Sequence, residues 1–321
     1  MKLFYFVILF WLNFKIFSQN YQWEIMPAYP GTEDITWDYQ NEMAFISCNE
    51  RRKKSIFYPK NGKIIGFQNN QLLNLHDEFN FPFHPHGIAF HSPAQKLYVI
   101  NHKNHKLTTV EVFQWDPKLL KLSHFRTIEH KSFISPNDIY VIDDEQFFLT
   151  NDPNNRSKLY MLIHFIFRMK SDKVIFYHQG DTKIFCKMNY PNGIILIDSL
   201  LFISSVYKKR IEVYHLEGKK TYQIQLDAAP DNLEIDEQKH LWTACHVKFN
   251  KFIKHLQDST VKSPFKIYQI QNPYSQDYQL KEVVINEQAN FSAASVAAPL
   301  KKWLLVGCVF DGKILVGKRK D

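Results

Sequence analysis

Two strand-forming runs, Asn137-Asp138-Ile139-Tyr140-Val141 and Gln146-Phe147-Phe148-Leu149-Thr150, set a pattern that the whole chain follows. A polar pair opens the first run, a short polar turn follows it, and the second apolar run completes a predicted β-hairpin. The pattern occurs six times along the sequence. Measured at the first apolar residue after each polar opening, the copies fall at positions 35, 88, 139, 194, 233 and 296, about 52 residues apart on average.

The length of this repeat predicts the fold class. A unit of roughly 40 to 50 residues with several strands is typical of a β-propeller, and six copies predict six blades. We therefore expect an all-β protein, a six-bladed β-propeller over residues 21–321. Because the first strand of a blade lies nearest the axis, the polar openings should converge at one mouth of the central channel. These openings are Glu33-Asp34, Pro85-His86-Gly87, Pro136-Asn137-Asp138, Pro191-Asn192-Gly193 and Asp231-Asn232.

The converging side chains predict a central calcium site. Two carboxylates and three amides form a ligand set of oxygens alone, which suits Ca²⁺: Glu33, Asp231, Asn137, Asn192 and Asn232. Zinc prefers thiolates or several imidazoles, and His86 is the one imidazole in this set, so zinc is disfavoured. Asp34 and Asp138 each follow a proposed ligand and should point away from the first ion. There they would hold a second ion or satisfy buried backbone amides. The opening of the sixth unit, residues 292–295, offers nothing comparable.

The N-terminus predicts a targeting segment. Lys2 is followed by an apolar run from Leu3 to Leu12, and Asn13 and Lys15 interrupt the apolar character soon afterwards. We interpret residues 1–20 as a signal peptide or an uncleaved N-terminal anchor. The rest of the protein would then be secreted or lumenal, or membrane-associated through this segment. Two glycosylation sequons, at Asn155 and Asn290, agree with that route.

Composition and charge exclude several other classes of protein. Hydrophobic residues make up 45% of the chain and charged residues 22%, which is ordinary globular usage and excludes a disordered or collagen-like protein. The net charge is +8, but the tight basic runs are limited to residues 51–54 and 318–320. The remaining basic residues are scattered, so we expect no nucleic-acid partner.

A set of short motifs, occurring in order, gives the chain a resemblance to a known family. They run from about residue 22 to 316, and together they resemble the serum paraoxonase/arylesterase family, although each is weak alone. The motifs are Gly31-Thr32-Glu33-Asp34, Phe83-His84-Pro85-His86-Gly87-Ile88, Val99-Ile100-Asn101-His102, Val110-Glu111-Val112-Phe113, Thr127-Ile128-Glu129-His130, Asn137-Asp138-Ile139, Thr150-Asn151-Asp152, Asn192-Gly193-Ile194, Asp231-Asn232, Leu241-Trp242-Thr243-Ala244-Cys245-His246 and Gly307-Cys308-Val309-Phe310.

The resemblance implies a fold, a reaction and two calcium ions. Family members are six-bladed propellers that hydrolyse lactones and aryl esters. The resemblance assigns the catalytic Ca²⁺ to Glu33, Asn137, Asn192, Asp231 and Asn232, and the structural one to Asp34, Asp138 and the backbone carbonyl of Ile88. It makes His86 the general base, oriented and relayed by His102. Without the resemblance, His102 would be interpreted as a buried core histidine at a strand end.

Three features of the sequence depart from the family or leave a choice open. His84 stands where the family usually has Asn, so hydrogen bonding near His86 should differ.

Cysteines are absent from both ends of the propeller, so ring closure should depend on strand pairing instead of the family's disulfide. We expect free, buried thiols, with a Cys48–Cys308 bridge as the alternative. The apolar stretch Leu159–Phe167 is expected to be a short helical or apolar roof that touches membrane or lipid, or else a core strand.

The expected function is calcium-dependent hydrolysis of a small-molecule lactone or aryl ester. One alternative is a non-catalytic, paraoxonase-like lumenal chaperone or binding protein. A gluconolactonase-like enzyme and a protein-binding scaffold are two further alternatives for the function. The Asp231-Asn232 and His86/His102 pairs favour the paraoxonase branch over the gluconolactonase-like one.

Overall fold

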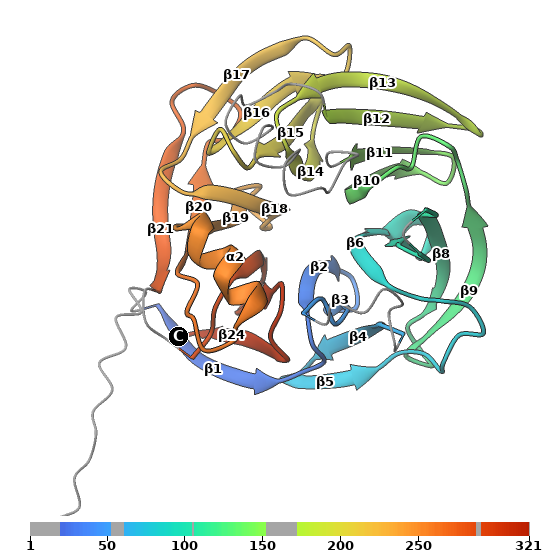
Figure 1. Ribbon diagram of the computed structural model, residues 1–321, viewed down its shortest axis with the longest axis horizontal. Helices are drawn as coiled ribbons and strands as arrows, with labels where there is room; N and C mark the ends of the chain where they lie inside the picture. The colour runs from blue at the N-terminus through green and yellow to red at the C-terminus, as the bar shows by residue number, and fades with distance from the viewer. Residues whose placement is uncertain (1–19, 53–60, 105, 152–171, 287–289, 321) are drawn as a thin grey trace, which may run out of the picture.

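The computed structural model describes residues 20–52, 61–104, 106–151, 172–286 and 290–320. Six four-stranded antiparallel sheets surround a central axis as the blades of a propeller (Figure 1). The predicted fold class, an all-β six-bladed propeller, is confirmed. In blades 1 to 5 the polar opening lies at the start of the innermost strand.

Each of the first three blades contains four consecutive strands. Blade 1 is formed by β2 (Thr32–Asp38), β3 (Met43–Cys48), β4 (Lys63–Gln68) and β5 (Gln71–Asn74). Blade 2 contains β6 (Pro85–His91), a short 3₁₀ turn η1 (Ser92–Ala94), β7 (Lys96–Asn101), β8 (Thr109–Asp116) and β9 (Lys121–Ile128). Blade 3 contains β10 (Pro136–Asp143), β11 (Gln146–Asn151), β12 (Asp172–His178) and β13 (Asp181–Met188).

The last three blades follow the same order, with one exchange. Blade 4 contains β14 (Pro191–Ile197), β15 (Leu200–Ser205), β16 (Arg210–His215) and β17 (Lys220–Gln225). Blade 5 contains β18 (Ala229–Ile235), β19 (Leu241–His246), helix α2 (Phe249–Gln257), β20 (Phe265–Gln271) and β21 (Gln279–Asn286). Blade 6 combines β22 (Ala294–Leu300), β23 (Trp303–Cys308) and β24 (Lys313–Arg319) with the N-terminal strand β1 (Tyr21–Pro27).

The ring is closed by hydrogen bonds between the two ends of the chain. Strand β1 pairs antiparallel with β24 from Tyr21 opposite Arg319 to Pro27 opposite Lys313. All four cysteines are free, and Cys48 and Cys308 are buried thiols that form no disulfide. The structure thus confirms closure by strand pairing and rules out the alternative bridge. Burial raises the pKa of the Cys308 thiol to about 12. A raised pKa is typical of a buried thiol that packs in the core and is not reactive.

The core lies between neighbouring blades. Strands of blades 1 and 2, for example, share one cluster in which Phe45 contacts Trp115 edge-on at 5.0 Å between ring centroids. In blade 3, Phe147 stacks on Tyr177 at 4.4 Å. Each fully buried aromatic side chain contributes about 2 kcal/mol through the hydrophobic effect. Packing of this kind holds the six inner strands at fixed positions around the axis.

A register shift occurs near the start of the inner strand in every blade. The pairing with the second strand is interrupted between Pro85 and Ile88 in β6, and between Pro136 and Ile139 in β10. The other four inner strands are interrupted at the equivalent place. Such a bulge takes residues out of the regular alternation and re-aims their side chains. The shifts coincide with the polar openings. They explain how two consecutive side chains of one strand can both lie near the channel.

Glycine allows neighbouring inner strands to approach each other closely at the polar openings. A Cβ on Gly193 would lie 2.6 Å from the carbonyl oxygen of Asp231, and one on Gly87 would lie 2.4 Å from the carbonyl oxygen of Asn137. No other residue fits without movement of backbone. Gly87 and Gly193 therefore allow neighbouring inner strands to pack backbone against backbone.

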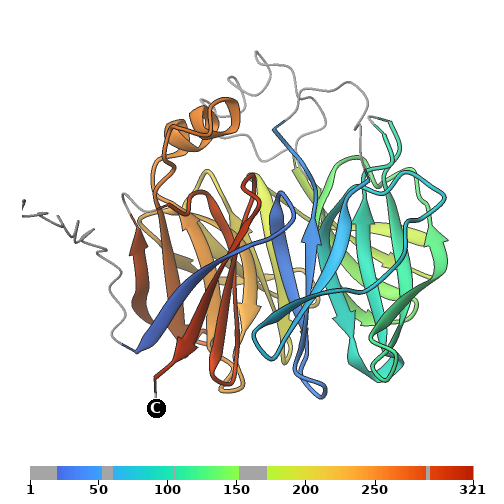
Figure 2. The ribbon, with the colours of Figure 1, turned by 90° about the horizontal axis from the view of Figure 1, so that it is seen from below.

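Helix α2 lies at the same end of the propeller as the polar openings (Figure 2). It follows β19, whose last residue, His246, is paired with Ala229 at the start of the inner strand β18. Phe252 of the helix packs on His246, with ring centroids 4.2 Å apart, and on Phe310 of blade 6. The expected roof, Leu159–Phe167, lies outside the described residues. No helix in the described part of the chain is long and apolar enough to cross a membrane.

Candidate active site

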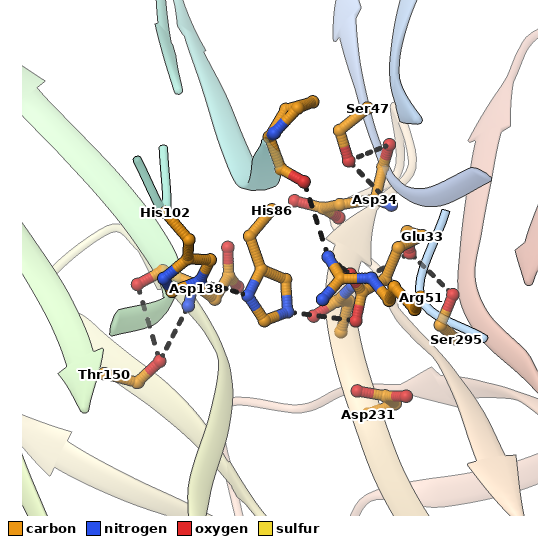
Figure 3. A network of polar contacts seen from close by, with 12 residues as sticks. Glu33, Asp34, Ser47, Arg51, His86, His102, Asp138, Thr150, Asp231 and Ser295 are labelled. Atoms are coloured by element: carbon orange, nitrogen blue, oxygen red, sulfur yellow. Dashed lines mark hydrogen bonds and ion pairs between the residues drawn. The ribbon is translucent and has the colours of Figure 1, made fainter. Parts of the chain in front are cut away.

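Glu33, at the start of the inner strand β2, lies at the centre of a buried polar network (Figure 3). One carboxylate oxygen, Oε1, lies 3.0 Å from Nε2 of His86, and the other, Oε2, forms an ion pair with the guanidinium of Arg51. The main chain of Glu33 is held as well. Its carbonyl oxygen accepts a hydrogen bond of 2.6 Å from the Ser295 hydroxyl and one of 3.1 Å from the Asn232 side-chain amide.

The Glu33 carboxylate is ionised despite its burial. Burial alone would raise the pKa of this carboxylate. The positive charge of Arg51 and the hydrogen bond from His86 lower the pKa, and together they outweigh the effect of burial. The pKa of Glu33 is therefore below its ordinary value. A fixed negative charge at the channel mouth is the feature that a cation site requires.

His86 connects Glu33 to a second histidine. Nδ1 of His86 lies 2.9 Å from Nε2 of His102, and Nδ1 of His102 lies 3.1 Å from the hydroxyl of Thr108. In the neutral state, one arrangement satisfies all these contacts: Thr108 donates to His102, His102 donates to His86, and Nε2–H of His86 donates to Glu33. The predicted histidine pair is thus brought into direct contact, and a proton can move along it.

The four remaining predicted ligands of the first ion are all buried at the same mouth of the channel: Asn137, Asn192, Asp231 and Asn232. Asp231 accepts a hydrogen bond from Nε2 of His246 at 2.8 Å. Burial raises the pKa of Asp231, and the bond from His246 opposes that rise. The side-chain oxygens of Asn192 and Asn232 are buried and have no hydrogen-bond partner within the described residues.

These observations test whether the site fits a calcium ion. Unpaired buried carbonyl oxygens are costly unless something coordinates them, and Asn192 and Asn232 present two. Glu33 adds an ionised carboxylate, and all the donors are hard oxygens, which Ca²⁺ prefers. Within the described residues, no cluster of three or more His, Cys, Asp or Glu side chains has the geometry of a metal site. The fit therefore depends on the amides together with Glu33 and Asp231.

Asp34 and Asp138 lie next to these ligands and bind backbone amides. Asp34 accepts from the N–H of Ile35 at 3.0 Å and of Ile88 at 2.7 Å. Asp138 accepts from Ile139 at 2.7 Å and from Ile194 at 2.8 Å. Each aspartate therefore links its own blade to the next blade through a hydrogen bond from a backbone N–H. Ile88 contacts Asp34 through its N–H; a role for its carbonyl at a second ion stays a prediction.

Burial and neighbouring carboxylates disfavour the charged form of both aspartates. Burial and the nearby Asp138 raise the pKa of Asp34 well above its ordinary value. Burial, with the charges of Asp231 and Glu33, raises the pKa of Asp138 to about 8. Buried carboxylates that lie close to other carboxylates behave in this way.

His84 supports the loop that carries His86. Its backbone N–H donates to the side chain of Asn101 at 2.7 Å, and its carbonyl accepts from the N–H of His102 at 3.1 Å. Burial and the positive charge of Arg51 lower the pKa of His84 to about 4. His84 is therefore neutral near pH 7 and fixes the two strand ends that present His86 and His102.

Three residues of the network were not predicted from the sequence: Arg51, His246 and Ser295. Arg51 belongs to the basic run 51–54, which the sequence did not connect with the site, but it follows β3 and pairs with Glu33 at the channel mouth. His246 ends β19 opposite the start of β18, a position that the repeat pattern could have marked. Of the two sequons, Asn290 is exposed, and Asn155 lies outside the described residues.

The fold and this network define a class: a six-bladed propeller with a carboxylate, amides and a buried histidine pair at one mouth of its channel. The family model described as Arylesterase matches residues 25–316. The chain therefore belongs to the arylesterase family. It is 26% identical over 294 residues to serum paraoxonase/lactonase 3 of Rattus norvegicus, covering 88% of this chain and 78% of that protein. It is also 26% identical over 301 residues to human serum paraoxonase/arylesterase 1, covering 87% and 84%.

Solved structures give the same fold at low sequence identity. A putative gluconolactonase superposes with a TM-score of 0.59 at 13% identity, covering 95% of this chain and 94% of that one. A gluconolactonase from Xanthomonas campestris gives a TM-score of 0.59 at 13% identity, covering 93% and 90%. At such identity these similarities show the propeller architecture alone.

Proposed function

We propose that this protein hydrolyses lactones and aryl esters at the channel mouth around Glu33 and His86. The observation that carries the proposal is the position of His86, buried between the carboxylate of Glu33 and the second imidazole of His102. Membership of the arylesterase family and the relatives named as lactonases and arylesterases support the same reaction class.

In this proposal His86 takes a proton from the attacking water. Water attacks the ester carbonyl, His86 accepts its proton, and the proton then returns to the leaving oxygen. Nε2 of His86 can accept that proton when the ring is in the neutral tautomer with its hydrogen on Nδ1, where it donates to Nε2 of His102. Nδ1–H of His102 then donates to the Thr108 hydroxyl, so both contacts are kept and no ring moves. His102 acts through His86 and is a positioning residue.

We further propose that Glu33, Asn137, Asn192, Asp231 and Asn232 hold a Ca²⁺ ion at this mouth. The ion would polarise the ester carbonyl and stabilise the charge that forms on its oxygen. Buried amide oxygens without hydrogen-bond partners in the described part of the chain support this assignment. We assign Asp34, Asp138 and the Ile88 carbonyl to a second, structural ion. The burial of both aspartates beside the other carboxylates at this mouth supports that assignment.

One observation favours a non-catalytic binding protein instead. Arg51 forms an ion pair with the Glu33 carboxylate, which is one of the proposed calcium ligands. In that alternative the salt bridge would be permanent and the channel would bind a ligand without turning it over. Secretion or membrane association through residues 1–20, and contact with a lipid surface, stay predictions.

A turnover assay on the full chain tests the proposed function. The substrates are δ-valerolactone and phenyl acetate, each measured with excess Ca²⁺ and again after chelation by EDTA. We expect hydrolysis of at least one substrate, lost on chelation and restored by added Ca²⁺. A folded protein that binds Ca²⁺ and turns over neither substrate would support the non-catalytic alternative.

A further inference from the structure

Arg51 and a calcium ion would need the same carboxylate. The Arg51 guanidinium forms its ion pair with Oε2 of Glu33, one of the two carboxylates in the proposed ligand set. Two cations that share one buried carboxylate repel each other strongly, because the surrounding dielectric is low. Binding of one therefore disfavours the other.

The remaining contacts of Arg51 are few. Its guanidinium lies 3.4 Å from the carbonyl oxygen of Pro85, which is a long hydrogen bond. Its Nε is buried and has no hydrogen-bond partner within the described residues. The side chain is 18% exposed, so it retains a route to solvent. The position of Arg51 therefore depends mainly on Glu33.

The next residue, Arg52, is held in a different way. Its guanidinium donates to Asp311 at 2.6 Å, contacts the ring of His255 at 2.8 Å, and lies over the ring of Phe310 at 5.4 Å. These partners join blade 1 to helix α2 and blade 6, away from Glu33. The chain thus offers two adjacent arginines, one on the site carboxylate and one fixed elsewhere.

We infer that Arg51 is a built-in competitor of calcium, an internal cation that neutralises Glu33 in the metal-free protein and is displaced from it when the ion binds. The inference rests on the proposed calcium site and adds a regulation of that site. Arg51 keeps the buried carboxylate of Glu33 paired when no ion is present. It also weakens the affinity for Ca²⁺, so that the site fills only at a high calcium concentration.

The first test compares calcium dissociation constants of the full chain by competition with a fluorescent chelator at fixed pH and ionic strength. Arg51→Met and Arg51→Gln remove the competing charge, and we expect each to bind Ca²⁺ at least about ten-fold more tightly, a difference of about 1.4 kcal/mol. Arg51→Lys keeps the charge and Arg52→Met removes a charge outside the site. We expect both controls to stay within about three-fold of wild type.

Three results would overturn the inference. If wild type binds Ca²⁺ and neither neutral variant binds it more tightly, the inference is wrong while the calcium site stands. If Arg52→Met gains as much affinity as Arg51→Met, the effect is one of overall charge and not of competition for Glu33. If neither wild type nor the variants bind Ca²⁺, the proposed calcium site fails and the inference fails with it.

A second test needs no variant and so does not depend on mutant folding. Phenylglyoxal modifies accessible arginine side chains, and tandem mass spectrometry distinguishes modification at Arg51 from that at Arg52. We expect added Ca²⁺ to raise the modification of Arg51 in wild type several-fold and to leave Arg52 unchanged. Unchanged modification of Arg51 across saturating Ca²⁺ would contradict its displacement.

Discussion

The hydroxyl of Ser295, on the inner strand of the last blade, donates a hydrogen bond of 2.6 Å to the carbonyl oxygen of Glu33, on the inner strand of the first. Both residues are buried, and 262 positions separate them in sequence. This bond joins the two ends of the ring at the height of the site. The backbone of the central carboxylate is therefore fixed by ring closure itself.

Removal of this bond should destabilise the protein. We expect Ser295→Ala to lower the free energy of unfolding by about 1 kcal/mol, the usual net value of a buried hydrogen bond. Urea unfolding measures the loss. Ser123→Ala, at an exposed position on the outer strand β9, is the matched control and should stay within about 0.5 kcal/mol of wild type. Equal stability of the two variants would show that the bond contributes nothing.

Gly193 should be required for both stability and calcium binding. Its substitution by Ala places a Cβ 2.6 Å from the carbonyl oxygen of Asp231 and 2.7 Å from Cα of Asn232. We expect Gly193→Ala to cost about 1–3 kcal/mol of stability and to weaken Ca²⁺ binding, because two proposed ligands must shift. Ser123→Ala, at an exposed position on the outer strand β9, is the control. Unchanged calcium affinity in Gly193→Ala would contradict the prediction.

Loss of a proposed ligand should weaken calcium binding directly. Asn192→Ala removes an amide oxygen that has no hydrogen-bond partner in the described structure, and Asp231→Ala removes a carboxylate. We expect each variant to raise the calcium dissociation constant at least about ten-fold, about 1.4 kcal/mol. Titration calorimetry checks this, with Asn290→Ala, at an exposed position, as the control. An Asp231→Ala protein with wild-type affinity would defeat the metal assignment.

His102 should affect turnover without affecting binding. Because Nε2 of His102 contacts Nδ1 of His86, and Glu33 contacts the other ring nitrogen, His102→Gln should lower kcat by about ten-fold or more. KM and calcium affinity should stay near wild type. Steady-state kinetics separate these quantities. If KM rises while kcat is unchanged, His102 shapes the substrate pocket and does not orient His86.

The strands of this protein could be predicted because each blade repeats one hydrophobic pattern. The two runs around Asn137 and Gln146 became β10 and β11, with Ile139 opposite Leu149. The equivalent pairs formed in the other five blades. Convergence of the polar openings followed from the propeller geometry: Glu33 contacts His86, and both lie close enough to Asp231 to affect its pKa.

The rest of the site could not be predicted, for physical reasons. Arg51 lies on a loop outside the repeat, and nothing in a basic run indicates which of its members turns inward. Ser295 is an ordinary small residue until ring closure brings it to the Glu33 carbonyl. Helix α2 was missed because Phe249, Phe252 and Leu256 lie in a short segment with no capping side chain, and their partners come from blades 4, 5 and 6, far away in the sequence.

The central claim is that His86 and the oxygens around Glu33 form one hydrolytic site. The most direct measurement is the turnover of δ-valerolactone by wild type and His86→Gln, each shown by calorimetry to have the same calcium occupancy. We predict that His86→Gln loses turnover by about 100-fold or more while its calcium affinity and stability stay near wild type. Full turnover in a calcium-loaded His86→Gln protein would contradict the account.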